Sequence, residues 1–113
     1  MKKIIFLSLS LLLFCSCANK KLYSWGKYES SSYNYLKASD DKSAQALAET
    51  YQSIIDKQTG TRGVVPPGIY ADYGFLLLQT NKIKEGKEML LKEIALYPES
   101  KVFIDRILKK LEK

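Results

Sequence analysis

The sequence of 113 residues contains no histidine. Histidine is the commonest general base and the commonest metal ligand in proteins, and its absence excludes serine–histidine and cysteine–histidine catalysis. The sequence also lacks a glycine-rich phosphate loop, a cluster of metal ligands and a nucleic-acid-binding motif. These absences predict a protein that is not an enzyme. We expect no cofactor, no metal, no nucleic acid and no small-molecule substrate.

Long hydrophobic runs are scarce, and the one that stands out covers residues 4–14, interrupted only by Ser8 and Ser10. A transmembrane helix needs about 20 apolar residues, so this run is too short to span a bilayer. Its length, and the two lysines that precede it, are typical of a signal peptide. We therefore expect residues 1–16 to form a signal peptide.

Cysteine is equally scarce, because Cys15 and Cys17 are the only two and both lie at the end of this run. No internal disulfide is then available after Cys17. Ser16 before Cys17 resembles the lipobox of bacterial lipoproteins, in which a small residue precedes the acylated cysteine; bulky Phe14 before Cys15 does not. The resemblance implies lipidation of Cys17, and Ala18 after it implies sorting to the outer membrane. An anchor of several acyl chains holds a protein stably at a membrane. An ordinary secretory peptide with a chance cysteine is the alternative.

Positive charge is in excess, with 18 Lys+Arg against 12 Asp+Glu and a net charge of +6. Such a charge usually favours acidic partners. Cleavage before Cys17 removes Lys2 and Lys3, which lowers the side-chain charge from +6 to +4. The remaining cations are spread along the predicted helices, so the charge does not indicate nucleic acid.

Residues 17–27 are predicted to form a lipidated tether and an aromatic lead-in. Lys20 and Lys21 either touch anionic head groups or act as solvated spacer residues, and we favour the spacer. Behind them come five aromatic residues between positions 23 and 35, namely Tyr23, Trp25, Tyr28, Tyr33 and Tyr35.

Residues 28–113 are predicted to form one helical domain. Apolar residues recur at spacings of three and four over residues 41–58, 68–80, 83–97 and 100–112, and a further short helix is compatible with residues 28–38. The Ser-Asp-Asp run at 39–41 is a helix start signal, and Asn81 tolerates the left-handed conformation that ends helices. No segment alternates with period two. The sequence therefore predicts an all-α fold of antiparallel hairpins, with about four helices after the signal peptide.

The helical pattern also assigns inner faces. It places Ile83 and Leu90 on the inner side of the third helix, and Phe103 and Ile104 on the inner side of the fourth. Glu85, Glu88 and Glu93 could suggest a carboxylate metal site, but lysines between them favour a solvated charged face.

One tetratricopeptide-like unit is predicted from Pro67 onward. Counting from Pro67, small residues fall at Gly74 and Gly86, where two antiparallel helices approach closely. Glu93 departs from the pattern, because alanine is usual at its position. Residues 28–58 could form a preceding, degenerate hairpin. Two hairpins fall short of the roughly three repeats that make a stable stack, so we expect an apolar face that a partner or the folded-back aromatic segment covers.

Three motifs, at residues 23–28 (YSWGKY), at 66–74 (PPGIYADYG) and at Glu93 followed by 97–100 (YPES), together resemble a family of small bacterial lipoproteins classed as domain-of-unknown-function 4810. The resemblance implies an outer-membrane lipoprotein that faces the periplasm. It also implies other envelope lipoproteins as companions, one of them similar to the curli secretion-channel component. No catalytic activity follows from it.

The favoured functional hypothesis is a non-enzymatic adaptor of an envelope transport or assembly complex. Its predicted partner-binding residues are Tyr23, Trp25, Tyr28, Pro67, Tyr70 and Tyr73, because aromatic rings bury large areas at a small entropic cost. The alternative function is a lipoprotein that binds peptidoglycan or another glycan through Trp25 and the tyrosines. A purely structural interpretation, in which Trp25 and Tyr28 pack on the helices as a lid, also stays open.

Overall fold

The computed structural model of the chain describes residues 2–4 and 20–113. Most of the expected signal peptide and the expected lipidation site, Cys17, lie outside the described residues. Residues 20–113 form α-helices joined by short turns and one longer loop, and contain no strand. The helices are α2 (Tyr28–Ala38), α3 (Asp41–Asp56), α4 (Ile69–Gln79), α5 (Ile83–Leu96) and α6 (Lys101–Leu111), with a 3-10 turn η2 (Pro98–Ser100) before α6.

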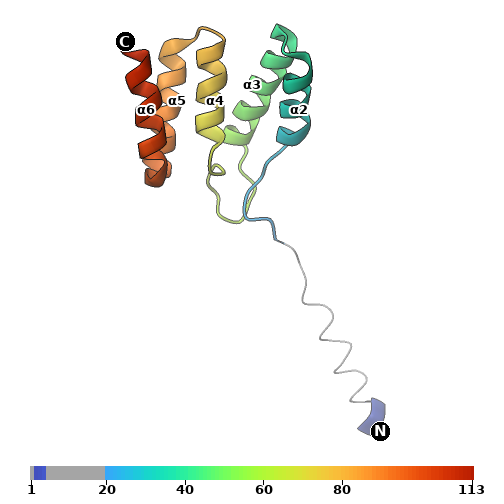
Figure 1. Cartoon of the computed structure of the whole chain (residues 1–113). Coiled ribbons are helices and arrows are strands. Elements are labelled where there is room, and N and C mark those ends of the chain that lie inside the picture. Colours follow the sequence, from blue (N-terminus) through green and yellow to red (C-terminus); the bar gives the residue numbers. More distant parts are fainter. Residues whose placement is uncertain (1, 5–19) are drawn as a thin grey trace.

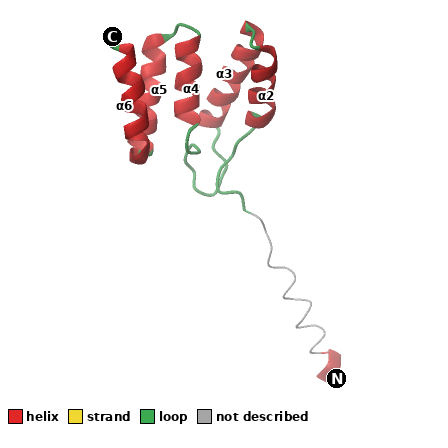
Figure 2. Cartoon of the chain, viewed as in Figure 1, coloured by secondary structure: helices red, strands yellow, loops and turns green. Residues whose placement is uncertain are grey.

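The helices run up and down in chain order (Figure 1), and no strand lies between them in the described part (Figure 2). α2 packs against α3, α4 packs against α5, and α6 returns beside α5. The prediction of an all-α fold of antiparallel hairpins is confirmed, and residues 28–38 do form the short additional helix. None of the helices in the described ranges is long and apolar enough to cross a membrane.

Local side chains set the predicted helix boundaries. Asp40 begins α3 with a capping box: its carboxylate accepts from the Ser43 backbone N–H at 2.7 Å, and the Ser43 hydroxyl accepts from the Asp40 N–H at 3.2 Å. Hydrogen bonds from Ser43 hold the pKa of Asp40 below its usual range. Asn81 has a φ of 64° in the turn between α4 and α5, which confirms the left-handed conformation expected there.

The close approach of α4 and α5 depends on two glycines. A Cβ at Gly74 would lie 2.9 Å from the carbonyl oxygen of Gly86 and 3.0 Å from the side chain of Leu90. A Cβ at Gly86 would lie 2.8 Å from Leu78 and 2.9 Å from the carbonyl oxygen of Gly74. These separations are shorter than carbon–carbon or carbon–oxygen contact allows, so the predicted role of both glycines is confirmed.

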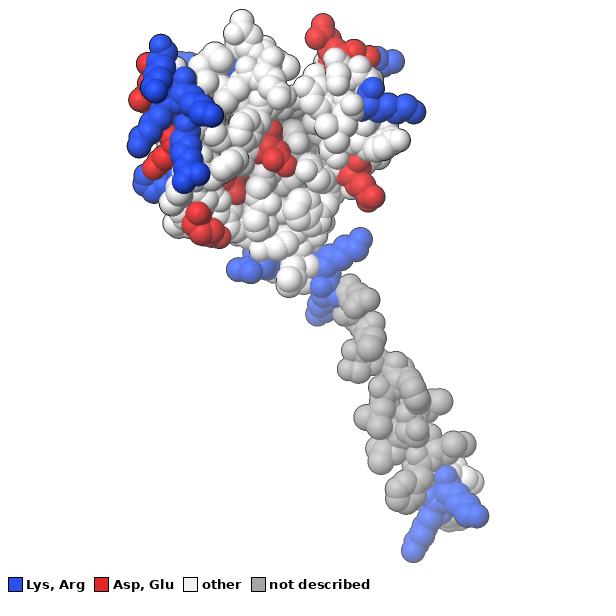
Figure 3. Space-filling view, in the orientation of Figure 1, with Lys and Arg blue, Asp and Glu red and all other residues white. Residues whose placement is uncertain are grey.

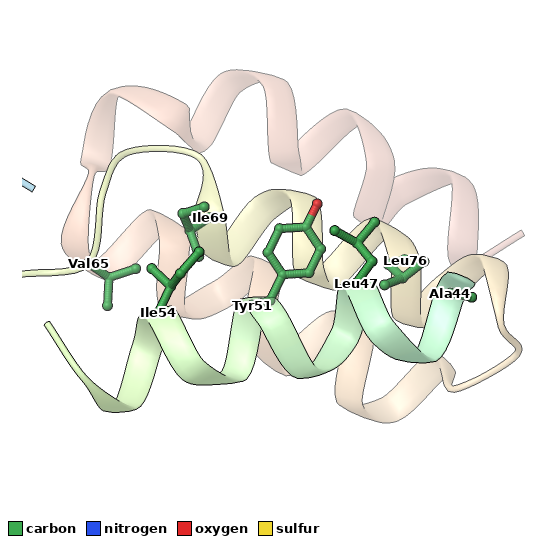
Figure 4. Packing of buried hydrophobic residues seen from close by; sticks show 7 residues of the cluster. All are labelled: Ala44, Leu47, Tyr51, Ile54, Val65, Ile69 and Leu76. Carbon is green, nitrogen blue, oxygen red and sulfur yellow. The ribbon is translucent and has the colours of Figure 1, made fainter. Parts of the chain in front are cut away.

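The core has two parts. The larger one lies between α3, the loop before α4 and α4 (Figure 4), and its buried residues are Ala44, Leu47, Tyr51, Ile54, Val65, Ile69 and Leu76. The smaller one joins α4, α5 and α6 through Ala71, Leu90 and Ile104. α4 supplies residues to both parts, so it connects the two hairpins.

Two predicted inner-face residues lie outside the core. Ile83 is 39% exposed, because it is the first residue of α5 and lies at the end of the helix rather than between helices. Phe103 is 57% exposed, because the adjacent Ile104 occupies the core position at 0% exposure. Neighbouring residues of a helix point about 100° apart, so both cannot point into the same core.

Candidate functional site

An aromatic row connects the N-terminal part of the described chain to α4. The ring centroids of Trp25 and Tyr28 are 5.7 Å apart, those of Tyr28 and Tyr51 are 5.9 Å apart, and those of Tyr51 and Tyr73 are 5.5 Å apart. These separations are typical of interacting aromatic pairs. Tyr51 is buried within the row, whereas Trp25 at its end is 43% exposed. The partly exposed indole of Trp25 therefore rests on tyrosine rings that are packed against the core.

Two hydrogen bonds of similar geometry tie α2 to α4 beside this row. The Tyr28 hydroxyl donates to Asp72 at 3.0 Å, and the Tyr35 hydroxyl donates to Gln79 at 3.2 Å. Both pairs are separated by seven residues along their helices, so α2 and α4 run in the same direction. Desolvation raises the pKa of Asp72, while the hydrogen bond from Tyr28 opposes that rise. Asp72 therefore does more than place a charge in the first turn of α4.

Residues 20–27, here called the strap, lie against the loop that precedes α4. The Gln58 side chain accepts from the backbone N–H of Ser24 at 2.7 Å and donates to the Ser24 carbonyl at 3.1 Å. The backbone N–H of Thr61 donates to the Lys21 carbonyl at 3.0 Å, and that of Arg62 donates to the Leu22 carbonyl at 3.1 Å. These bonds fix the strap backbone from Lys21 onward.

Gly60 shows how closely the strap and the loop approach each other. A Cβ at this position would lie 2.3 Å from the Leu22 carbonyl oxygen and 2.5 Å from the Tyr23 Cα. Both contacts are with backbone, which cannot rotate away as a side chain could. Only glycine therefore fits here.

Tyr23 has different surroundings from the aromatic row. The Arg62 guanidinium lies 5.8 Å from the centre of the Tyr23 ring, in a cation–π arrangement. Tyr97 lies nearby and donates from its hydroxyl to the Val65 carbonyl at 2.6 Å. Desolvation, together with a hydrogen bond to Tyr23, raises the pKa of Tyr97 to about 12. These contacts connect the strap to the end of α5.

Glu93 is a buried carboxylate that the sequence interpretation had placed on a solvated face. It is 1% exposed, and its Oε1 accepts from the backbone N–H of Gly68 at 2.8 Å. Gly68 precedes the first turn of α4, so Glu93 from α5 satisfies a free N–H at a helix start. Burial raises the pKa of Glu93, and the bond from Gly68 opposes that rise. The departure from alanine at this repeat position was the one sequence signal for this role.

The predicted partner-binding residues fall into separate places. Trp25, Tyr28 and Tyr73 come together in the aromatic row, and Tyr70 packs against the same core part. Tyr23 lies apart, under Arg62. Pro67 is exposed at the start of α4, beside the buried Pro66.

A second aromatic surface, here called the α4–α6 face, was missed by the sequence interpretation. The rings of Phe75 on α4 and Phe103 on α6 have centroids 6.1 Å apart. Phe103 is 57% exposed on this face, whereas its neighbour Val102, which is 68% exposed, points about 100° away from it. Two adjacent large apolar residues in α6, followed directly by the core residue Ile104, were the available signal that one of them points outward.

Comparison with known proteins identifies a family, but no individual similar protein. No curated protein and no solved structure matches this chain. The described residues contain no group of three or more potential metal ligands. A family model described as a domain of unknown function, DUF4810, matches residues 22–107, which include most of the strap and nearly all of the helical domain. The chain therefore belongs to the DUF4810 family.

Proposed function

We propose that this protein is a non-enzymatic adaptor in an envelope transport or assembly complex. In this proposal it is a lipoprotein, anchored in the outer membrane through Cys17 and facing the periplasm, and its partners are other envelope lipoproteins, among them one similar to the curli secretion-channel component. The lipobox-like sequence before Cys17 and the family resemblance support the location. The α4–α6 face supports the binding role.

The uncovered side chains of the α4–α6 face are the observation that carries the proposal. Phe103 is 57% exposed, although its ring already lies against Phe75 in a tilted arrangement. A partially supported, rigid aromatic ring is the kind of group that contributes most of the energy at protein interfaces. Burial of exposed apolar surface contributes about 25 cal/mol per Å². A partner that covers this face would therefore be bound with substantial energy.

The remaining exposed residues of α6 differ in character. Its other exposed positions carry Lys101, Arg106, Lys109 and Lys110, as is usual for a helix that caps a helical stack with a polar surface. Of the two exposed apolar residues of α6, only Phe103 contacts α4, through Phe75; Val102 lies on the same side of the helix as Arg106 and Lys109. On the α4–α6 face the exposed aromatic surface is therefore limited to Phe75 and Phe103, while the outer side of α6 is mostly charged, which distinguishes a docking surface from a generally apolar end of the stack.

The test is recovery of the partner from detergent-solubilised envelope with the tagged, full-length protein. We expect the protein to recover another envelope lipoprotein, and we expect Phe103→Ala to reduce that recovery about tenfold or more, as loss of a central interface aromatic does. Leu91→Ala is the matched control, since Leu91 is 56% exposed on α5. Trp25→Ala tests the exposed end of the aromatic row in the same assay.

The alternative is glycan binding, and its outcome is distinct. Retention of the protein on isolated peptidoglycan sacculi, without any protein partner and with loss on Trp25→Ala, would contradict the adaptor proposal. An equal loss of recovery for Phe103→Ala and Leu91→Ala would contradict the assignment to the α4–α6 face. Circular dichroism of each variant checks that helicity is unchanged.

A further inference from the structure

The distance along the chain from the proposed anchor to the first fixed residue is very short. Four peptide units separate Cys17 from Lys21, and a fully extended chain spans at most about 3.6 Å per residue, or about 14 Å in all. The backbone is fixed from Lys21 onward by the bond between its carbonyl and the N–H of Thr61. A lipid attached at Cys17 therefore holds this part of the domain close to the bilayer surface.

The side chains at this end of the domain, here called the anchor pole, carry an excess of cations over carboxylates. Its exposed cations are Lys20, Lys21, Lys27, Lys57, Arg62 and Lys101, and its exposed carboxylates are Glu29, Asp56, Asp72 and Glu99. The lysines nearest the proposed anchor, Lys20 and Lys21, have no carboxylate beside them in the strap. Figure 3 shows basic side chains where the described domain meets the segment drawn in grey. Electrostatic attraction to an anionic surface acts over about 8 Å at physiological ionic strength, so these cations would lie within its range.

Apolar side chains with the exposure expected at a lipid interface accompany these cations. Leu22 is 58% exposed and Trp25 is 43% exposed. Trp25, Lys20 and Lys21 line one pocket of about 580 Å³ together with the loop at Thr59. Tryptophan beside lysine is a common combination at membrane–water interfaces, because the ring is apolar and its N–H remains hydrated.

We propose that the anchor pole lies directly on the anionic phospholipid head groups of the leaflet that holds the lipid anchor. Lys20 and Lys21 contact the lipid phosphates, Leu22 and Trp25 enter the interface, and Arg62 and Lys57 flank them. In this proposal the strap is a fixed membrane-contacting segment, and Lys20 and Lys21 are bound to lipid phosphates instead of being solvated spacer residues. This inference rests on the proposed anchoring at Cys17.

The contact would also set the orientation of the domain. α3 ends and α4 begins at the anchor pole, and α6 ends at the opposite pole (Figure 1). With the anchor pole on the membrane, the helices rise away from the surface. The α4–α6 face then points sideways, toward neighbouring proteins attached to the same leaflet.

Trp25 is the only tryptophan of the chain, so its fluorescence reports on the anchor pole alone. The full-length protein would be produced in a bacterium that acylates lipoproteins, purified in detergent and reconstituted into vesicles. One set of vesicles contains phosphatidylethanolamine with phosphatidylglycerol, and the other contains phosphatidylcholine alone. Each set carries a lipid with a nitroxide spin label on its head group, which quenches nearby tryptophan.

We expect strong quenching of Trp25 in the phosphatidylglycerol vesicles, and a several-fold weaker effect in phosphatidylcholine. Each basic residue near an anionic leaflet increases local association roughly fivefold, so Lys20→Glu with Lys21→Glu should remove most of the quenching. Lys109→Glu with Lys110→Glu, on α6 near the opposite pole, is the matched control and should leave the quenching unchanged. Raising the salt concentration should weaken it.

Intact mass and vesicle flotation establish the anchor independently of Trp25. An acylated, floating protein whose Trp25 is not quenched, or is quenched equally with and without Lys20 and Lys21, overturns this inference alone. A chain that carries no acyl groups and does not float overturns the proposed anchor, and this inference with it.

Discussion

Glu93 shows how one side chain couples two helices that are distant in sequence. It projects from α5 and accepts from the N–H of Gly68 at the start of α4, while its second carboxylate oxygen has no hydrogen-bond partner. Burial of a carboxylate is unfavourable unless hydrogen bonds compensate for lost hydration. The raised pKa of Glu93 shows that burial outweighs the bond from Gly68.

This raised pKa predicts a pH dependence of stability. Burial places the folded-state pKa of Glu93 above the ordinary glutamate value of 4.5. Above pH 4.5 the unfolded chain therefore loses the proton more readily, and the contribution of Glu93 to the free energy of unfolding falls as pH rises through the folded pKa. We expect the midpoint temperature of thermal unfolding of Glu93→Gln to rise relative to that of the wild type as the pH is raised from 4 to 7.

The matched control for this prediction is Glu88→Gln on the same helix, whose carboxyl is exposed and paired with Lys92. It should leave the pH profile nearly unchanged. A constant difference in midpoint temperature between Glu93→Gln and the wild type, at all pH values, would contradict the assignment. Scanning calorimetry at several pH values measures both.

At the scale of elements, the contact between α4 and α5 depends on glycine. Addition of a Cβ at Gly74 brings it to 2.9 Å from the Gly86 carbonyl oxygen, which is backbone and cannot move without separating the helices. Overpacking of this kind costs about 1–3 kcal/mol, against a gain of up to about 1 kcal/mol from the better helix propensity of alanine. The clash should dominate.

We therefore expect Gly74→Ala to lower the free energy of unfolding by about 1–2 kcal/mol in urea titrations followed by circular dichroism. Ser53→Thr, which adds a carbon at an exposed position of α3, should change it by less than about 0.5 kcal/mol. An unchanged or increased stability of Gly74→Ala would show that α4 and α5 can separate without loss of packing.

The strap is the second element whose position depends on a few contacts. Gln58 makes paired hydrogen bonds with the backbone of Ser24, and also donates to the Ile54 carbonyl at 3.2 Å. Gln58→Ala removes both bonds to the strap, but removes no buried apolar side chain from the core. We expect increased quenching of Trp25 by acrylamide in solution, with unchanged helicity.

The control for the strap is Gln52→Ala on α3, because Gln52 bonds to Asp56 and not to the strap. It should leave the accessibility of Trp25 unchanged. If Gln58→Ala lowered helicity as strongly as it exposed Trp25, the strap would be part of the folding core. Fluorescence and circular dichroism on the same samples distinguish the two results.

At the scale of the whole molecule, residues 20–113 form two hairpins and one further helix. The sequence led us to expect an apolar face covered by a partner or by the folded-back aromatic segment. The aromatic segment does fold back, but it lies against the loop before α4, through the bonds of Thr61 and Arg62. It does not lie on the α4–α6 face, where Phe103 is 57% exposed.

This arrangement separates the two proposed binding surfaces in space. The strap lies at the end of the domain where α2 begins (Figure 1), whereas the α4–α6 face is formed by Phe75 in the middle of α4 and Phe103 in the first turn of α6. In the proposed function, one surface therefore meets the membrane and the other meets a partner. The protein could therefore contact the membrane and a partner at the same time.

The sequence by itself determined the features that depend on near neighbours in the chain. Asp40 and Ser43 make their capping box within three residues, and Asn81 takes its left-handed conformation from its own backbone preference. Gly74 and Gly86 were also predictable, because repeat spacing places small residues where two adjacent helices cross. Fold class and helix positions followed from these local signals and from apolar periodicity.

The tertiary structure alone decided which residues meet across long separations. The bond from Tyr28 to Asp72 joins residues 44 positions apart, and the burial of Glu93 depends on the N–H of Gly68 25 positions away. Phe103 faces outward because Ile104 occupies the only core position beside it in α6. Periodicity defines the apolar side of a helix, but not which neighbour covers each part of it. That choice is made when the helices pack.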